Sequence, residues 1–276
     1  MNKKNPLFFF HIPKTAGSTM QWTLAQYYTA DEIAPAFTWT TLLGIDRPAL
    51  SRSRLFQGHF YGPLEQIIGT ACNTFTVLRD PIERALSHYG HVLSDKMHYL
   101  HRRALELETL DAYLEDRTTQ MTVSNFQSRM LAMDFDVQQF YSNLKTEERQ
   151  QWLLERYIET TDFELQSNVL FSRAQAKLQT FFLVGVTERF PATLAILCHS
   201  LGWKYPESTS DKNINVQRVR QNELAEHTLK RLKELNAIDI AVYSAAYDTF
   251  DNRINNLLIN MANTSSNGSL LRRLIA

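Results

Sequence analysis

The residues with the clearest chemistry lie in HIPKTAGST, at residues 11–19, directly after an apolar run that ends in FFF. The run predicts a short buried strand, and Pro13 followed by Gly17 predicts a break and then a helix. Backbone N–H groups and the positive end of the helix dipole then point at one place. Lys14 adds a charge there, and Ser18 and Thr19 add hydroxyl donors. This chemistry suits an anionic phosphate.

The segment is not a Walker A loop. That motif, GxxxxGK[ST], requires a glycine six residues before its lysine, and position 8 of this chain is Phe. The alternative to a phosphate site is an ordinary capped helix that follows a buried strand.

A second segment, NTFTVLRDPIERALSHY at residues 73–89, repeats this plan. An apolar strand ends at Arg79, an Asp-Pro pair breaks it, and a helix follows that carries Arg84 and Ser87. Arg79 is suited to bidentate binding of a phosphate, and Ser87 to donating a hydroxyl hydrogen bond. We interpret Asp80 as a helix cap and Arg84 as the partner of an acid. Two anion sites on neighbouring strands predict a ligand with two separated phosphates.

In this order, HIPKTAGST and LRDPIERALSHY resemble the sulfotransferase family related to heparan and uronyl 2-O-sulfotransferases, in particular its cytosolic, bacterial members. The resemblance is tightest over residues 7–89 and returns around residues 181–203 and 232–250. It implies 3′-phosphoadenosine-5′-phosphosulfate (PAPS) as sulfuryl donor and adenosine 3′,5′-bisphosphate (PAP) as product. In that family the first segment binds the 5′-phosphosulfate of PAPS and the second binds its 3′-phosphate. The donor ligands implied here are Lys14, Thr15, Gly17, Ser18 and Thr19 at the 5′ end and Arg79 and Ser87 at the 3′ end.

Two further polar segments resemble parts of the family's site. KNINVQRVR resembles the loop that closes over PAPS, with Asn215 and Arg218 as its best contacts. VSNFQSRMLAM resembles a segment that faces the acceptor, which implies acceptor contacts by Asn125, Gln127 and Arg129. These three residues share a face only in extended chain, so in a helix one or two of them reach the substrate. Solvated loops are the alternative for both segments.

His59, in LFQGHFYGP at the end of a predicted strand, is the candidate general base. Gly58 allows close approach of another backbone, and an imidazole accepts protons near neutral pH. The resemblance supports this role, because the 2-O-sulfotransferases carry a catalytic His in an HGH segment, where this chain has Gln57 in place of the first His. Lys14 is then expected to stabilise the leaving group. A structural histidine at a strand end is the alternative.

The other histidines are assigned no chemistry. His11 is read as part of the strand end, while His88, His91, His98 and His101 form two HxxH pairs. The i, i+3 spacing can place two imidazoles on one helix face, but no ordered set of carboxylates or thiolates accompanies them. We expect no metal, also because sulfuryl transfer brings less negative charge to neutralise than ATP chemistry does.

Composition fits one globular enzyme domain. The chain has 276 residues and 44% hydrophobic content, which is enough for one large core. With Lys+Arg 29 and Asp+Glu 29, it has no net charge, which argues against general binding of nucleic acids or anionic membranes. Cys72 and Cys198 predict reduced core thiols rather than a disulfide or metal framework.

The sequence predicts a cytoplasmic protein without an integral membrane segment. No stretch reaches 18 apolar residues, and the apolar run near Met1 is too short for a signal peptide and lacks a cleavage site.

The order of predicted elements indicates an α/β, P-loop-NTPase-like three-layer fold: a central parallel sheet flanked by helices, with an inserted helical cap. Predicted strands cover residues 7–11, 55–59, 75–79 and 181–186, and helices cover 17–28 and 82–93. We expect one domain over 1–262, a cap at 97–180 with helical patterns at 105–114 and 147–158, and a flexible tail at 263–276.

The sequence thus predicts a PAPS-dependent O-sulfotransferase that uses a His as general base. The resemblance implies a hydroxyl acceptor on a carbohydrate or glycolipid. The alternatives are a P-loop-like nucleotide or small-molecule kinase and a non-catalytic nucleotide-binding paralogue. The missing Walker A pattern disfavours the kinase, and the presence of Lys14, His59, Arg79 and Ser87 disfavours the inactive paralogue.

Overall fold

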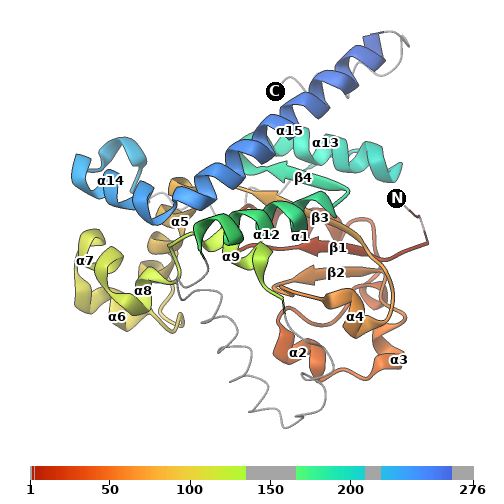
Figure 1. Cartoon of the computed structure of the whole chain (residues 1–276). Helices are drawn as coiled ribbons and strands as arrows, with labels where there is room; N and C mark the ends of the chain where they lie inside the picture. Colours follow the sequence, from red (N-terminus) through yellow and green to blue (C-terminus); the bar gives the residue numbers. More distant parts are fainter. Residues whose placement is uncertain (1, 3, 135–165, 209–218, 263–276) are drawn as a thin grey trace.

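The computed structural model of the chain describes residues 2, 4–134, 166–208 and 219–262. Its centre is a sheet of four strands in the order β2-β1-β3-β4, and all three pairings are parallel (Figure 1). The parallel sheet and the flanking helices confirm the expected α/β fold. The strands are β1 Leu7–Phe10, β2 Leu55–Gly58, β3 Asn73–Leu78 and β4 Leu183–Val186.

Helices cover both faces of the sheet, which is why its strands are apolar throughout. Phe8 and Phe10 of β1 point into a core shared with α4, α9 and α12, while Leu7 and Phe9 point into a core shared with α1 and α13. Phe9 and Phe10 are fully buried, and each such side chain contributes about 1.5–3 kcal/mol to folding. The ranges are α1 Gly17–Leu24, α4 Leu64–Ile68, α9 Phe126–Ala132, α12 Ser167–Gln179 and α13 Phe190–Leu201.

The long helix α15, Ala237–Ala262, passes along the β4 edge of the sheet and contributes to both cores (Figure 1). Val242 packs in the core of Phe8, and Phe250 packs in the core of Phe9. None of the described helices has the length and apolar character needed to cross a bilayer. The remaining short elements of the main body are η1 Ala30–Glu32, α2 Trp39–Leu43, α3 Arg47–Leu50 and η2 Thr187–Arg189.

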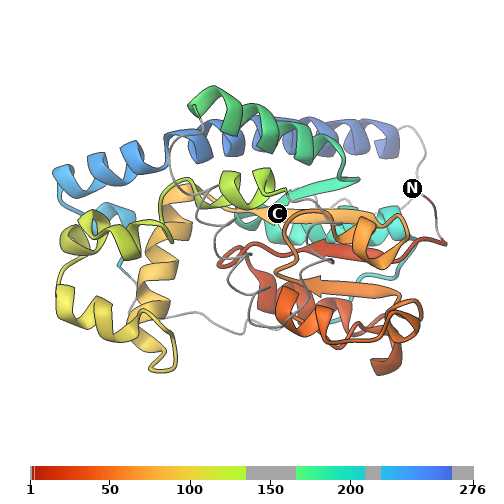
Figure 2. The same cartoon turned by 60° about the horizontal axis from the view of Figure 1, so that its bottom comes forward.

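A helical lobe stands at the end of the sheet toward which the strands run (Figures 1 and 2). Its core joins apolar residues of α5 to those of α6, α7 and α14, including the buried Tyr113. The lobe is therefore packed directly on the helix that follows β3. Its elements are α5 Pro81–Ser94, α6 His101–Leu107, α7 Leu110–Glu115, α8 Arg117–Gln120, η3 Gln221–Glu223 and α14 Glu226–Leu235.

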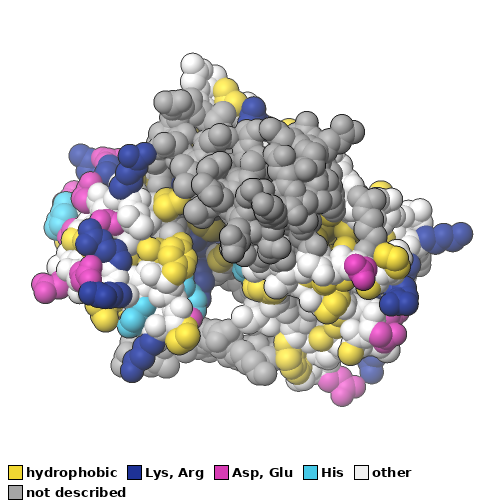
Figure 3. Space-filling model, turned by 90° about the horizontal axis from the view of Figure 1, so that it is seen from below, with side chains coloured by type: hydrophobic (Ala, Val, Ile, Leu, Met, Phe, Trp, Pro, Cys, Tyr) yellow, Lys and Arg dark blue, Asp and Glu magenta, His cyan; other side chains and the backbone are white. Residues whose placement is uncertain are grey.

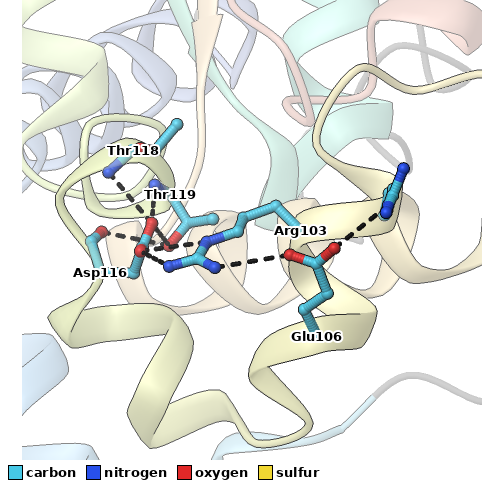
Figure 4. A network of polar contacts seen from close by, with 6 residues as sticks. Arg103, Glu106, Asp116, Thr118 and Thr119 are labelled. Atoms are coloured by element: carbon cyan, nitrogen blue, oxygen red, sulfur yellow. Dashed lines mark hydrogen bonds and ion pairs between the residues drawn. The ribbon is translucent and has the colours of Figure 1, made fainter.

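Ion pairs tie the lobe together at its surface (Figure 4). Arg103 of α6 donates to Asp116 at 2.5 Å and to Glu106 at 3.4 Å. The Asp116 carboxylate also accepts the N–H groups of Thr118 and Thr119, which caps the first turn of α8. Asp116 therefore links α6 to α8 as well as capping one of them.

The segment expected as one helical cap, residues 97–180, divides between two cores in its described part. Helices α6 to α8 belong to the lobe, whereas α9 and α12 cover the sheet through residues such as Met130 and Leu178. The helical pattern at 105–114 forms parts of two helices, separated at Glu108, whose φ is +60°. The pattern at 147–158 lies outside the described residues.

Candidate functional site

The loop between β1 and α1 has the backbone geometry of an anion-binding turn. Lys14 and Ala16 have positive φ values of 73° and 62°, whereas Thr15 between them does not have a positive φ. Such alternation turns successive backbone N–H groups toward one concave side. The Thr15 hydroxyl donates to the Ile12 carbonyl at 2.8 Å and is buried, so it holds the loop in this form. Helix α1 begins at Gly17, and Ala16 before it supplies no side-chain cap, so the positive end of the helix dipole lies at the loop.

Gly17 serves the packing of His11 rather than the flexibility of the loop. A Cβ atom at Gly17 would lie 1.6 Å from Nε2 of His11, so the imidazole occupies the space that a side chain would need. His11 is buried and stacks on Phe9 with ring centroids 5.2 Å apart. Its pKa lies well below 6.5 because of burial and the nearby His59 and Lys14. His11 is therefore a neutral packing element under the loop.

Arg79 connects the second segment to the first. It follows β3 directly, and its Nη1 donates to the Lys14 carbonyl at 3.1 Å. Because β1 and β3 are neighbouring parallel strands, their carboxyl ends meet at one edge of the sheet. The two segments predicted from the sequence thus come together there. A second N–H group of Arg79, on Nη2, lies 3.8 Å from Glu83.

Contacts from two other elements, α9 and η2, and a cap within the turn itself hold the turn between β3 and α5. The Gln127 amide of α9 bonds to both backbone groups of Arg79, at 2.8 and 3.0 Å. Glu188 of η2 accepts the Asp80 N–H at 2.9 Å, and the Asp80 carboxylate accepts the Glu83 N–H at 2.9 Å. Asp80 is therefore the N-cap of α5, as the sequence predicts. A turn braced in this way presents Arg79 in one orientation.

Arg84 and Ser87 lie on different parts of the α5 surface. Arg84 is fully buried, donates to the Thr122 carbonyl at 2.7 Å and lies over the ring of Phe126. Arg84 is thus a structural residue with a carbonyl and an aromatic ring among its partners, and the acid expected as its partner stays a prediction. Ser87 is half-buried, and no hydrogen bond of its hydroxyl occurs within the described part of the chain. Ser18 is exposed in the first turn of α1.

His59 directly follows β2 and lies beside the start of the first loop. Its N–H donates to the Phe37 carbonyl at 2.8 Å. Gly58 makes this approach possible, because a Cβ there would lie 2.5 Å from the same carbonyl oxygen. The His59 ring stacks on that of His11, with centroids 4.6 Å apart. The fold thus brings the candidate base next to the residue that begins the loop.

The contacts of His59 favour one tautomer. Its Nδ1 lies 2.9 Å from the His11 carbonyl oxygen and 2.8 Å from the Tyr61 hydroxyl, which itself donates to that carbonyl. A carbonyl oxygen only accepts, so the ring proton is assigned to Nδ1 and the lone pair to Nε2. Burial lowers the pKa of His59 below 6.5, although the bond with His11 opposes this in part. A neutral imidazole of this kind is suited to accept a proton at Nε2.

The three residues expected at the acceptor make contacts within the protein. Asn125 accepts the N–H groups of Ile238 and Asp239 at the start of α15, at 2.9 and 3.1 Å. Gln127 holds Arg79, and the buried Arg129 donates to the Met121 carbonyl. All three side chains are more than nine-tenths buried. Their contact with an acceptor stays a prediction, as does the role of Asn215 and Arg218, which lie outside the described residues.

Sequence reasoning missed two residues that position the site. Tyr61 shares the His11 carbonyl with His59, and Glu188 holds the turn after β3. The spacing of Tyr61, two residues after His59 in extended chain, is a signal that could have found it. Glu188 gives no such signal, because only the pairing of β3 with β4 brings it to Asp80.

The face seen in Figure 3 is hollowed between the lobe and the rest of the molecule, and Lys or Arg and His side chains are among those that border the hollow. A separate cavity of about 1100 Å³ lies on the Phe8 side of the sheet, between α4 and α12. Its lining includes neither Lys14 nor His59 nor Arg79.

Cys72 and Cys198 are free thiols, as the sequence predicts.

Comparison with known families agrees with this site. The chain matches the model of the sulfotransferase family over residues 1–248, a stretch that contains all four strands and both candidate anion-binding segments. No curated protein matches the chain. Since the family match spans nearly all of the 276 residues, the chain belongs to the sulfotransferase family, which includes the heparan sulfate 2-O-sulfotransferases.

Proposed function

We propose that this sulfotransferase moves the sulfuryl group of PAPS to a hydroxyl of a carbohydrate or glycolipid, with His59 as general base. The observation that carries the proposal is the hydrogen bond from Arg79 to the Lys14 carbonyl, which joins the two segments at the carboxyl edge of the sheet. A ligand that engages both segments at once needs two anionic groups a short distance apart. PAPS, with its 5′-phosphosulfate and 3′-phosphate, has this form.

The donor set fits such a ligand. The loop of Lys14 and Ala16 offers backbone N–H groups with the start of α1 behind them. Arg79 keeps further guanidinium N–H groups beyond those that bond to Lys14 and approach Glu83, and Ser87 offers a hydroxyl. These groups suit a 5′ site on the loop and a 3′ site on the turn.

His59 would receive the acceptor's proton. As the acceptor oxygen forms its bond to sulfur, its proton passes to Nε2, and the bond between sulfur and the phosphate oxygen of the donor breaks. The products are a sulfate ester and PAP. The Nδ1–H bond to the His11 carbonyl stabilises the imidazolium that results, in the way that an oriented acceptor supports a catalytic histidine.

Lys14 would stabilise the leaving group. Negative charge grows on the departing phosphate oxygen, and an ammonium together with loop N–H groups offsets that charge best where water is excluded. Lys14 is half-buried, and its carbonyl is fixed by Arg79. Loss of Arg79 should therefore disturb both ends of the donor.

A thermal-shift titration tests the donor. PAP is expected to raise the melting temperature without magnesium, whereas ATP has little effect, because a ligand stabilises only the fold that binds it. Arg79→Lys should reduce the PAP shift strongly, since a lysine lacks the bidentate geometry of the guanidinium. Arg102→Lys, at an exposed ion pair on α6, is the matched control. A large, magnesium-dependent shift with ATP and none with PAP would instead favour the kinase.

A transfer assay tests the acceptor. Labelled PAPS is offered with a panel of hydroxyl compounds that contains neutral sugars, uronic acids, glycolipids and simple phenols. Transfer to sugars or glycolipids supports the proposed acceptor class, and transfer to phenols alone contradicts it.

A further inference from the structure

Phe37 is a phenylalanine that the fold leaves open to solvent. It is 41% exposed, whereas the other phenylalanines in the described part of the chain are buried or half-buried. A single exposed apolar side chain is common on protein surfaces and does not by itself mark a site. Phe37 differs from such a residue because its ring contacts the candidate base.

The Phe37 ring lies against the imidazole of His59. Their centroids are 4.6 Å apart and their planes are inclined at 75°, which is an edge-to-face contact. The ring of His11, which stacks on that of His59, lies 5.9 Å from the Phe37 ring. Three rings therefore meet at the carboxyl ends of β1 and β2, and Phe37 is the exposed one among them.

The free nitrogen of His59 is accessible beside this ring. Nδ1 is taken up by the His11 carbonyl and the Tyr61 hydroxyl. Nε2 has no hydrogen bond within the described part of the chain, and it is not one of the buried unpaired atoms there, so it is open to solvent. An acceptor whose hydroxyl reaches Nε2 therefore comes next to the exposed ring of Phe37.

Main-chain contacts fix the Phe37 ring relative to His59. The Phe37 carbonyl accepts the His59 N–H at 2.8 Å, and the Phe37 N–H donates to the Thr41 hydroxyl at 3.2 Å. Thr38, the next residue, pairs with His59 in a parallel bridge just beyond β2. The ring and the imidazole thus keep one arrangement, as a binding surface next to a base requires.

Trp39 of α2 anchors the same segment in the core. Its indole N–H donates to the Tyr61 carbonyl at 2.8 Å, and its ring lies edge-on to that of Phe60 with centroids 5.8 Å apart. Trp39 is buried, whereas Phe37, two residues earlier, is exposed. Trp39 therefore holds the segment in place, and the Phe37 ring remains accessible to a ligand.

We propose that the exposed ring of Phe37 is an acceptor platform, on which a sugar ring rests while its hydroxyl reaches Nε2 of His59. This inference rests on the proposed function, which gives His59 the acceptor's proton. The face of an aromatic ring is partly negative, and the C–H groups on one side of a sugar ring are partly positive, so the two attract each other when stacked. Phe37 is then a specificity-determining residue of the acceptor site.

The surroundings of the acceptor platform suit a neutral sugar. In the described part of the chain, the ring contacts of Phe37 are with His11 and His59, and burial lowers the pKa of both imidazoles below 6.5. Contact with such a surface gains free energy from burying C–H groups rather than from pairing charges. A neutral pyranose is therefore expected to bind there without a carboxylate or sulfate substituent.

A packing role beneath His59 predicts different effects from a platform. If the Phe37 ring only supported the imidazole, its loss would lower kcat, and an apolar side chain of similar size would replace it. A platform acts on acceptor binding, so its loss raises KM and spares kcat. Phe37→Leu separates the two roles, because leucine keeps apolar bulk beside His59 but has no aromatic face. Phe37→Tyr keeps the aromatic face and is the conservative variant.

Steady-state kinetics with saturating PAPS tests the acceptor platform. The acceptors are methyl β-glucopyranoside and methyl β-galactopyranoside. We expect Phe37→Ala and Phe37→Leu to raise KM at least about fivefold with kcat within about twofold of wild type, and Phe37→Tyr to stay within about twofold in both. Ile259→Ala, which removes an exposed apolar side chain from α15, is the matched control and should change neither constant. PAP affinity should be the same in all of these proteins, because the donor site is intact.

Saturation-transfer NMR detects the contact without turnover. The protein is saturated with PAP, which carries no sulfuryl group to transfer, and its aromatic protons are irradiated in the presence of either methyl glycoside. We expect the saturation to pass to C–H protons on one side of the sugar ring. The transfer should be lost in Phe37→Leu and retained in Phe37→Tyr and Ile259→Ala.

Two results would overturn the platform and leave the proposed function intact. In the first, Phe37→Leu binds and sulfates the glycosides as wild type does. In the second, the variants lose kcat with KM unchanged, which makes Phe37 a support of His59. Sugar transfer by the wild-type protein persists in both cases. Transfer to phenols alone, with neither glycoside bound to the PAP complex, would instead overturn the proposed acceptor class and the platform with it.

Discussion

The side-chain amide of Gln127 bonds to both backbone groups of a single residue, Arg79. Its Nε2 donates to the Arg79 carbonyl at 2.8 Å, and its Oε1 accepts the Arg79 N–H at 3.0 Å. Gln127 itself is 1% exposed, and its own N–H is held by Asp239 at 2.9 Å. Arg79, the residue proposed to bind a phosphate, is therefore held in position by α9 and α15 as well as by β3.

Gln127→Ala should destabilise the protein and weaken PAP binding together. The change leaves the N–H and carbonyl of Arg79 unpaired in a half-buried place, which we expect to cost about 2–4 kcal/mol. Chemical denaturation measures the loss of stability, and a PAP titration measures the loss of affinity. Gln26→Ala, at an exposed position after α1, is the control for losing a glutamine. Unchanged PAP affinity in Gln127→Ala would contradict a positioning role.

Gly17→Ala should disturb His11 and, through it, His59. The new methyl group would fall 1.6 Å from Nε2 of His11, so the imidazole must move out of its stack with His59. Overpacking of this kind costs about 1–3 kcal/mol. Thermal unfolding measures the cost.

The double variant Gly17→Ala with His11→Ala provides the control for this packing. His11→Ala removes the atom that the methyl group meets. This substitution should therefore lower the free energy of unfolding less in the Gly17→Ala variant than in wild type. Additive losses would show that the two residues do not interact in this way.

His59→Ala should retain PAP binding and lose transfer. The side chain directly follows β2, and in the proposed reaction it acts on the acceptor's proton rather than on the donor. Removal of a general base is expected to lower kcat about 10²–10⁴-fold. Calorimetry with PAP and transfer from labelled PAPS measure the two properties. Retained transfer would remove His59 from the base role.

Tyr61→Phe is the matched control for His59. It removes the hydroxyl that lies 2.8 Å from Nδ1 but leaves the 2.9 Å contact of Nδ1 with the His11 carbonyl. We therefore expect a smaller loss of kcat, about tenfold or less.

In wild type, kcat/KM should rise with pH through a pKa below 6.5 and then level off, because the base acts in its neutral form.

Mild acid should destabilise the fold through His11 and His88. Burial holds both pKa values well below 6.5, so the contribution of these residues to stability is complete above that value and is lost as the pH falls toward the folded-state pKa values. Each proton can lower the free energy of unfolding by up to about 1.4 kcal/mol per pH unit. Denaturation midpoints from about pH 8 to about pH 5 measure the trend. His199→Gln should leave it unchanged, and a midpoint that does not vary over this range would contradict it.

The sequence by itself determined the local parts of this protein. Runs such as FFF at the end of β1 and TVL at the end of β3, each followed by a proline and a helix start, predicted the strands and the turns after them. Asp80 was readable as a helix cap, and the two segments together pointed to the family. All of these signals act over a few residues, where chain geometry and hydrogen-bond chemistry are the same in any fold.

Only the tertiary structure decided which distant residues meet. Arg79 reaches the Lys14 carbonyl because β1 and β3 pair in parallel, and Gln127 reaches Arg79 because α9 packs on the sheet. The same packing gave Asn125 and Arg129 partners inside the protein. A side chain's partners depend on the register of strands and the packing of helices over the whole chain, and spacing along the sequence carries no record of either.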